Sequence, residues 1–274
     1  MMKQIKNRLA FSMLELIFVI VILGIVSSIG AEIIAKVYDN YITQRAQHRA
    51  SVKTQVTLNQ IVNRLRYAIP NTIVRRAGKT GVAENIQRGD AMGSDQDDYT
   101  VLQWVGADSD SFEAITSATN RKPGWSGFCD LDASSQTSIV SSGSNFTLTN
   151  IIQGNLGRTG NFAIFFQGDY ITAHPGTGAG EIITLGTASG RISERYKLAW
   201  TSYALSVEGG DLYLYYNFTP ATGAVINGTR TLLLKNVTNF KFTSKGESTR
   251  IKICVVENIG EANPIPSCKE KVVF

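Results

Sequence analysis

A nearly uninterrupted apolar run close to the start of the chain constrains its fold more than any other feature. Residues 8–30 read RLAFSMLELIFVIVILGIVSSIG, and the only carboxylate among them is Glu15. The uncharged stretch from Leu16 to Ala31 is about 24 Å long as a helix, and apolar residues before it extend it towards the length of a membrane span. A carboxylate near a bilayer has to be neutralised or paired, so Glu15 needs an explanation of its own.

Two ordinary interpretations of this run leave Glu15 unexplained. Three basic residues and no acid precede the run, which by the positive-inside rule places the N-terminus in the cytoplasm. The run then resembles a secretory signal peptide, in which the small residues Ser28-Ile29-Gly30 allow cleavage before Ala31. It also fits a plain transmembrane anchor.

A third interpretation accounts for the carboxylate. The stretch Ala10-Phe11-Ser12-Met13-Leu14-Glu15, followed by about twenty mostly apolar residues, resembles the processing signature of type IV pilins and pseudopilins. The resemblance implies that a prepilin peptidase cuts between Ala10 and Phe11 and methylates the new amine of Phe11. Glu15, the fifth mature residue, would then be neutralised by the amine of a neighbouring subunit in a filament core of low dielectric constant.

The chain departs from the family pattern at two positions. Ala10 stands where glycine is usual before the cut, and Glu32 stands where many major pilins have a proline. The resemblance also implies a single-pass inner-membrane protein with a periplasmic head, later incorporated in a pilus or pseudopilus. Its implied partners are other pilin or pseudopilin subunits, the prepilin peptidase, an inner-membrane assembly platform and the lipid bilayer.

The segment that follows the apolar run predicts a stem. Apolar residues, Val52 and Val56 among them, recur at spacings of three and four as far as Leu65 and Ile69, and predict a face that packs on the head. No proline occurs before Pro70. We expect a helix of more than fifty residues that ends near residue 68. The predicted organisation is a leader at 1–10, a membrane and assembly helix at 11–35, an amphipathic stem at 36–78 and a head at 79–274.

The head is predicted to be rich in strands. From about residue 98 the apolar pattern has a period of two, with strands expected at 99–105, 161–167, 181–186, 196–207, 211–218, 231–237, 239–244 and 250–256. The connection Glu208-Gly209-Gly210 predicts a hairpin between 196–207 and 211–218. Residues 106–160 are expected to form mostly loops or short strands. The fold class is therefore α+β, a long helix on an antiparallel sheet, as in pilins.

Three cysteines, Cys129, Cys254 and Cys268, allow three single disulfides. The tail from Ile251 to Phe274 predicts a hairpin with a long loop, ENIGEANPIPS at 257–267, and Cys254 and Cys268 are symmetric about Glu261 near its centre. We prefer this pair, because the two cysteines could face each other across the strands of the hairpin. Closing a loop of about fifteen residues would contribute about 3 kcal/mol in the chain-entropy model. Many pilins have a similar cysteine-closed loop near the C-terminus.

Charge gives limited support for a nucleic-acid partner. The net charge of +5 falls to +2 once Lys3, Lys6 and Arg8 of the leader are removed, because 24 basic then face 22 acidic residues. In the stem, Arg45, Arg49 and Lys53 form an i, i+4, i+8 stripe that suits DNA phosphates or anionic lipid. We favour the alternative that the stripe pairs with acids of the head, such as Asp95, Asp97 and Asp98, or with neighbouring subunits.

No catalytic or cofactor motif is recognised. His48 and His174 have no ligand spacing around them, and GTGAG at 176–180 lacks a following helix, so we expect it to be a loop. The carboxylates Asp95, Asp97 and Asp98 are the candidates for Ca²⁺, although they fit no EF-hand and we favour no metal site.

These observations predict a minor pilin or pseudopilin that initiates or caps a type II secretion pseudopilus or a type IV pilus, and not an enzyme. The retained Glu15 argues against the tip subunit that often lacks this residue. The alternatives are a competence-type pilin that binds DNA and a secreted or anchored binding protein behind an ordinary signal sequence.

Overall fold

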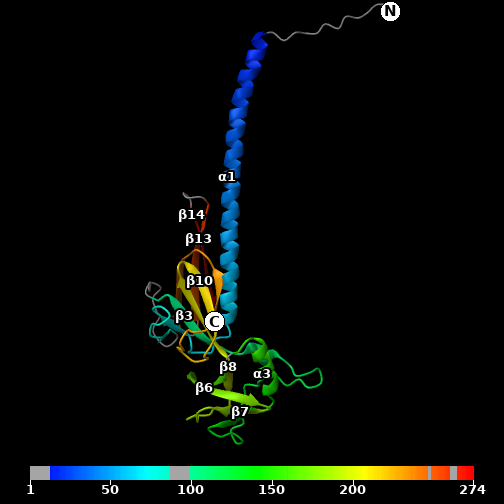
Figure 1. Cartoon of the computed structure of the whole chain (residues 1–274), viewed down its shortest axis with the longest axis vertical. Helices are drawn as coiled ribbons and strands as arrows, with labels where there is room; N and C mark the ends of the chain where they lie inside the picture. Colours follow the sequence, from blue (N-terminus) through cyan, green and yellow to red (C-terminus); the bar gives the residue numbers. More distant parts are fainter. Residues whose placement is uncertain (1–12, 87–98, 159, 246–247, 260–263) are drawn as a thin grey trace, which may run out of the picture.

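The computed structural model describes residues 13–86, 99–158, 160–245, 248–259 and 264–274. One long helix, α1 (Met13–Leu65), projects from a head made of strands, and its C-terminal half lies against that head (Figure 1). The chain is therefore α+β, with a long N-terminal apolar helix and antiparallel sheets, as predicted.

Helix α1 ends earlier than the pattern suggested, and the range predicted as stem also contains a strand. The helix stops at Leu65, and the backbone N–H of Ile69 instead donates to the carbonyl of Val105, while Ala107 N–H donates to Tyr67 O. Pro70 lacks an N–H and disfavours a helical residue before it. The backbone after Leu65 therefore joins the head instead of extending the stem to residue 78.

Three antiparallel sheets make up the head. The six-stranded sheet has the order β11-β10-β9-β3-β1-β2, and the three-stranded sheet has the order β12-β13-β14. The five-stranded sheet, in the order β4-β7-β6-β5-β8, forms the end of the head farthest from the N-terminus of α1 (Figure 1). The strands of the first two sheets are β1 (Val74–Arg76), β2 (Glu84–Asn85), β3 (Val101–Gly106), β9 (Thr201–Glu208), β10 (Asp211–Phe218), β11 (Thr229–Leu234), β12 (Val237–Lys245), β13 (Ser248–Asn258) and β14 (Pro264–Val273).

The third sheet and two short helices form a distal module within residues 107–200. Its elements are α2 (Ser109–Glu113), β4 (Ser138–Val140), α3 (Phe146–Asn155), β5 (Phe162–Phe166), β6 (Asp169–Ala179), β7 (Ile182–Leu185) and β8 (Tyr196–Ala199). The module has a separate apolar core that includes Trp125, Phe146 and Phe162. A small cluster around Ile69, Val105 and Phe165 joins the module to the rest of the head.

The main core lies between α1 and the first two sheets. The buried residues of the helix recur at spacings of three and four, from Ala46 through Leu58 to Leu65. They pack with Leu212 and Leu214 of β10 and with the inward residues of β13. Burial of this apolar face is what fixes the stem to the head.

The predicted strand at 196–207 is two strands that belong to different sheets. Ala199 of β8 pairs with Ala163 in the distal module, whereas Thr201 of β9 pairs with Gly106 in the six-stranded sheet. The chain crosses between the sheets at Trp200. The hairpin of β9 and β10 across Gly209-Gly210 is confirmed, with Asp211 opposite Glu208.

The glycine-rich segment at 176–180 is mostly strand, so the expectation of a loop was wrong. Gly176 and Gly178 are buried in β6. A Cβ on Gly178 would lie 2.5 Å from Cγ of Phe146, the first residue of α3. Glycine is therefore required by the close approach of a helix to the strand, and not by a turn.

The expectation of loops and short strands over 106–160 was wrong in part, because this region also contains two helices, α2 and α3, whereas β4 is a short strand as expected. Asn145 caps α3, and its side chain accepts a hydrogen bond from Leu148 N. Thr and Asn residues with low helix propensity obscured the helix in the sequence.

Candidate functional site: the exposed apolar helix and the stem

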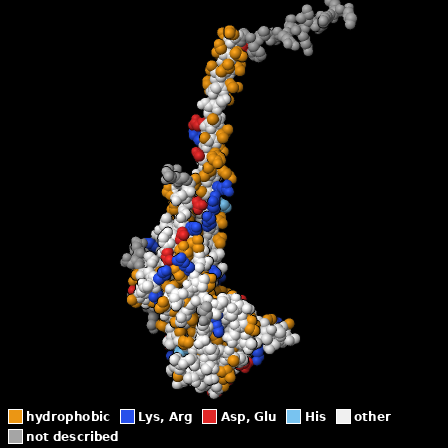
Figure 2. All heavy atoms as spheres, viewed as in Figure 1, with side chains coloured by type: hydrophobic (Ala, Val, Ile, Leu, Met, Phe, Trp, Pro, Cys, Tyr) orange, Lys and Arg blue, Asp and Glu red, His pale blue; other side chains and the backbone are white. Residues whose placement is uncertain are grey.

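The apolar half of α1 is exposed over its whole length. In the described part of the chain, α1 is the one helix that is long and apolar enough to cross a membrane. None of its most apolar 18-residue stretch is buried. Figure 2 shows its hydrophobic side chains covering the end of the helix farthest from the head. Leu16, Phe18 and Leu23 are each more than half exposed. Such a surface requires lipid or protein around it.

Glu15 lies in the first turn of this helix. Its neighbours Leu14 and Leu16 are apolar and exposed. A carboxylate in the first turn also benefits from the positive end of the helix dipole. The next charged residues along the helix are Glu32 and Lys36, whose side chains form an exposed i, i+4 ion pair of 2.6 Å. The stretch between Glu15 and Glu32 is uncharged.

The predicted processing residues Ala10 and Phe11 lie outside the described residues. The same is true of Asp95, Asp97 and Asp98, the candidates for Ca²⁺ and for pairing with the stem. Among the residues that the structure describes, no group of three or more His, Cys, Asp or Glu side chains could hold a metal ion.

The basic stripe of the stem faces an acid of the head. Arg49 Nη1 lies 3.7 Å from Glu257 Oε1, and Lys53 Nζ lies 3.8 Å from Glu257 Oε2. Arg45, the third member of the stripe, is exposed. Glu257 was not singled out in the sequence, because it lies near the end of β13, and only the tertiary fold brings that end beside the stem. We expected the stripe to pair with acids of the head, but we named Asp95, Asp97 and Asp98 and not Glu257.

An open groove runs beside the stripe. It has a volume of about 520 Å³ and lies between α1 and strands β11 and β13. Val52 and Val56 of the stem line it opposite Leu232, and each of the three is between two fifths and one half exposed. The sequence pattern had placed both valines on the buried face, whereas the buried face is formed by Ala50, Thr54 and the residues that follow at helical spacing.

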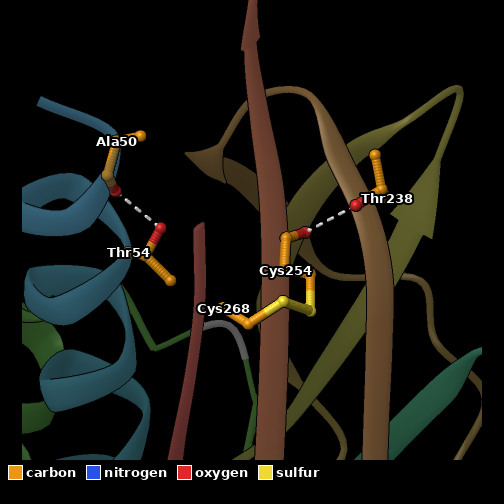
Figure 3. The surroundings of a disulfide bond; sticks show 5 residues. All are labelled: Ala50, Thr54, Thr238, Cys254 and Cys268. Carbon is orange, nitrogen blue, oxygen red and sulfur yellow. Dashed lines mark hydrogen bonds between the residues drawn. A yellow bond between two sulfur atoms is a disulfide. The ribbon is translucent and has the colours of Figure 1, made fainter. Parts of the chain in front are cut away.

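Cys254 and Cys268 form the predicted disulfide. They are directly opposite each other on β13 and β14, with their Cα atoms 4.0 Å apart. Figure 3 shows the bridge on the side of the strands that faces away from the stem residues Ala50 and Thr54. Thr238 Oγ1 donates to the carbonyl of Cys254 at 3.4 Å. The predicted long loop is shorter than expected, because β13 extends to Asn258 and β14 begins at Pro264.

The remaining reactive side chains lie apart from one another. Cys129 is a free, buried thiol, and its burial raises its pKa, which suppresses the reactive thiolate. His174 lies on β6 against the ring of Phe166, and its burial lowers its pKa. Cys129 Sγ lies 3.4 Å from the hydroxyl of Ser134, and the carboxylate of Asp169 opposes the lowering of the His174 pKa by burial.

Comparison with protein-family models, with curated proteins and with solved structures finds no match for this chain.

Proposed function

We propose that this chain is a minor pilin or pseudopilin, a subunit that helps to initiate or cap a type II secretion pseudopilus or a type IV pilus. The observation that carries the proposal is Glu15, a carboxylate in the first turn of an exposed apolar helix that continues without a break into the stem. A plain anchor gains nothing from a carboxylate at the bilayer. In a filament, the methylated amine of one subunit's Phe11 neutralises the Glu15 of another, so assembly is favoured.

Two further features support assembly through the helix. The exposed apolar surface is long enough to contact both lipid and neighbouring helices. The groove beside Val52 and Val56 leaves apolar stem surface open where a neighbouring subunit would pack. In this proposal the cytoplasmic leader is removed, the apolar helix spans the inner membrane and the head is periplasmic.

The N-terminus of the mature chain is the direct test. Mass spectrometry of membranes from cells with and without the prepilin peptidase should give N-methyl-Phe11 in the first case and the uncut chain in the second. A start at Ala31 would identify an ordinary signal peptide, and an uncut chain in both strains would identify a plain anchor; either result contradicts the proposal.

Substitution of Glu15 tests the assembly step separately. Glu15→Ala should leave cleavage intact and abolish recovery of the chain in crosslinked complexes with other pilin-like subunits. Glu32→Ala is the matched control, because it removes an exposed acid of the same helix that lies outside the uncharged stretch. Equal crosslinking of Glu15→Ala and the wild type would contradict the assembly role.

The DNA-binding alternative is less favoured because two of the three stripe cations lie beside Glu257. We propose no binding of duplex DNA at low salt by the full chain. Glu257→Gln would expose Arg49 and Lys53, so salt-dependent binding that appears in the wild type and increases in this variant would support the DNA-uptake function instead.

A further inference from the structure

A second cleft lies where the distal module meets the six-stranded sheet. Its volume of about 480 Å³ falls within the roughly 300–1,000 Å³ that is usual for small-ligand sites. The module contributes residues at the start of β5 and within β6, and the sheet contributes the end of β10 and the start of β11. Trp200 lines it at the point where the chain crosses between the two sheets.

The lining of this cleft is uncharged throughout. All of the described residues around it are Gly, Ala, Pro, Asn, Thr, Phe or Trp. The stem groove differs, because Lys53, Lys235 and Glu257 line it. A phosphate or carboxylate ligand is usually bound by a cationic side chain, and a cationic ligand by a carboxylate. The cleft therefore suits a neutral, polar ligand.

Amide groups are available at its mouth. Asn161 and Asn227 are exposed there, and within the described part of the chain their side chains make no hydrogen bond. Each amide offers both donors and an acceptor. Such a group can bond vicinal hydroxyls, which act as donor and acceptor at the same time.

A third amide is held rigidly at the same wall. Asn217 has a φ of 60°, its Nδ2 donates to the carbonyl of Gly157 at 2.6 Å, and its N–H donates to Thr201 Oγ1 at 2.8 Å. The pairing of β10 with β9 is irregular between Tyr215 and Phe218. Such bulges redirect side chains and are common beside binding sites.

Two aromatic side chains, Phe218 and Trp200, also line the cleft. They are 5% and 9% exposed, so a ligand reaches only a small part of each ring. The negative face of an aromatic ring attracts the slightly positive C–H edges of a ligand. A sugar ring combines an apolar C–H face with an edge of hydroxyl groups.

From this combination of neutral amides, a bulged wall and aromatic surface, we propose that the cleft binds a neutral saccharide. The proposal goes beyond the assembly function and does not depend on it, since none of these residues lies on the helix or the stem.

The test uses the full chain in phospholipid nanodiscs, without glycoside detergents that would occupy the cleft. Maltotriose, cellotriose and N,N′,N″-triacetylchitotriose serve as neutral probes in saturation-transfer NMR and calorimetry, and trigalacturonate serves as the acidic probe. We expect at least one neutral trisaccharide to bind and the acidic one not to bind. Asn161→Ala and Asn227→Ala should each weaken binding roughly three- to tenfold, as expected for one lost hydrogen bond.

Two further variants separate cleft binding from general effects. Thr229→Trp fills the cleft from an exposed strand position and should abolish binding, whereas Asn63→Ala, an exposed amide on the stem, should leave it unchanged. Folding of every variant is checked by formation of the Cys254–Cys268 disulfide. Failure of all three neutral probes with the folded wild type, preference for trigalacturonate, or binding that survives Thr229→Trp would each overturn the proposal.

Discussion

Gly106 and Thr201 are direct partners on neighbouring antiparallel strands, although residues 107–200 separate them along the chain. The whole distal module is therefore an insertion between two paired strands, β3 and β9. Gly106 is required at this point, because a Cβ would lie 2.5 Å from the ring of Tyr203. Without the module, β3 and β9 would still be neighbours, and the rest of the head would still form one connected structure.

Excision of the module should leave the stem and the first two sheets folded. Joining Gly106 to Thr201 through Asn-Gly replaces the insertion with a two-residue hairpin turn. The remaining chain should still form its disulfide and resist proteolysis, with a loss of roughly 2–4 kcal/mol because Ile69 and Val105 lose apolar cover. Rapid proteolysis throughout the stem and sheets would show that the module is integral to the core.

Removal of the disulfide should destabilise the C-terminal hairpin. In the Cys254→Ala, Cys268→Ala double variant we expect a loss of about 3 kcal/mol in the free energy of unfolding, since a loop of about fifteen residues is no longer closed. Amide exchange in β13 and β14 should accelerate.

Cys129→Ala is the control for this experiment, because it alters a buried thiol of the distal module and should leave exchange in the hairpin unchanged. Thiol titration of the unreduced, denatured wild type should find one thiol per chain. Three thiols, obtained from chains isolated under oxidising conditions, would contradict the pairing.

Arg76 should be sensitive even to replacement by lysine. Its guanidinium is buried and donates to Gln103 Oε1 at 2.8 Å, to Gly81 O at 2.9 Å, and to the carbonyls of Gly223 and Ala224. Burial lowers the pKa of Arg76, but the guanidinium remains charged. Lysine keeps the charge but cannot reach these separate acceptors.

We therefore expect Arg76→Lys to lose roughly 2–4 kcal/mol in denaturant unfolding. Arg75→Lys is the comparison at the adjacent residue, whose side chain is 13% exposed, donates to the more exposed Glu84 and lies over the ring of Tyr99. Its loss should be smaller, about 1–2 kcal/mol, because its acceptor is partly solvated. Similar losses for the two variants would show that the Arg76 network contributes no more than the pair of Arg75 with Glu84.

Asp108 should give the distal module a dependence on pH. It is 1% exposed, and Gln153 Nε2 donates to its carboxylate at 2.6 Å, while Ser111 N donates at 3.0 Å. Burial raises its pKa, an effect that these hydrogen bonds only partly offset. A raised pKa in the folded state means that protonation favours folding, so stability falls as the pH rises through that pKa.

The effect should appear above about pH 4, with a slope of at most about 1.4 kcal/mol per pH unit for one proton. Amide exchange of α3 at about pH 4 and pH 7 measures it. The dependence should disappear in Asp108→Asn and persist in Asp110→Asn, which alters the exposed neighbour. An identical pH profile for the wild type and Asp108→Asn would rule out this carboxyl as the source.

Local patterns predicted those elements in which apolar and polar residues recur with one period along the chain. The helix, the β9–β10 hairpin and the disulfide-bonded tail all follow from spacing within a short window. Trp200 shows the limit of that approach, since the continuous run of strand-forming residues over 196–207 conceals a crossing between two sheets. Only the long-range pairs of Ala199 and Thr201 decide where the strand divides.

The sequence likewise predicted only part of the candidate site. Glu15 stands out because a charge in an apolar run is locally anomalous. Glu257, Arg76 and the amide-lined cleft carry no local signal, since each depends on segments that are far apart in the sequence.

The uninterrupted helix between the apolar run and the head determines how far the head stands from a bilayer. Ala46 is the first buried residue of α1, so residues 32–45 form a bare neck of about 20 Å. If the apolar run lies in the membrane, the length of this neck sets the distance between the membrane and the head. The described helix contains no proline that would kink it. A tilt of the helix in the membrane would therefore displace the distal module, at the far end of the molecule, more than it displaces the neck.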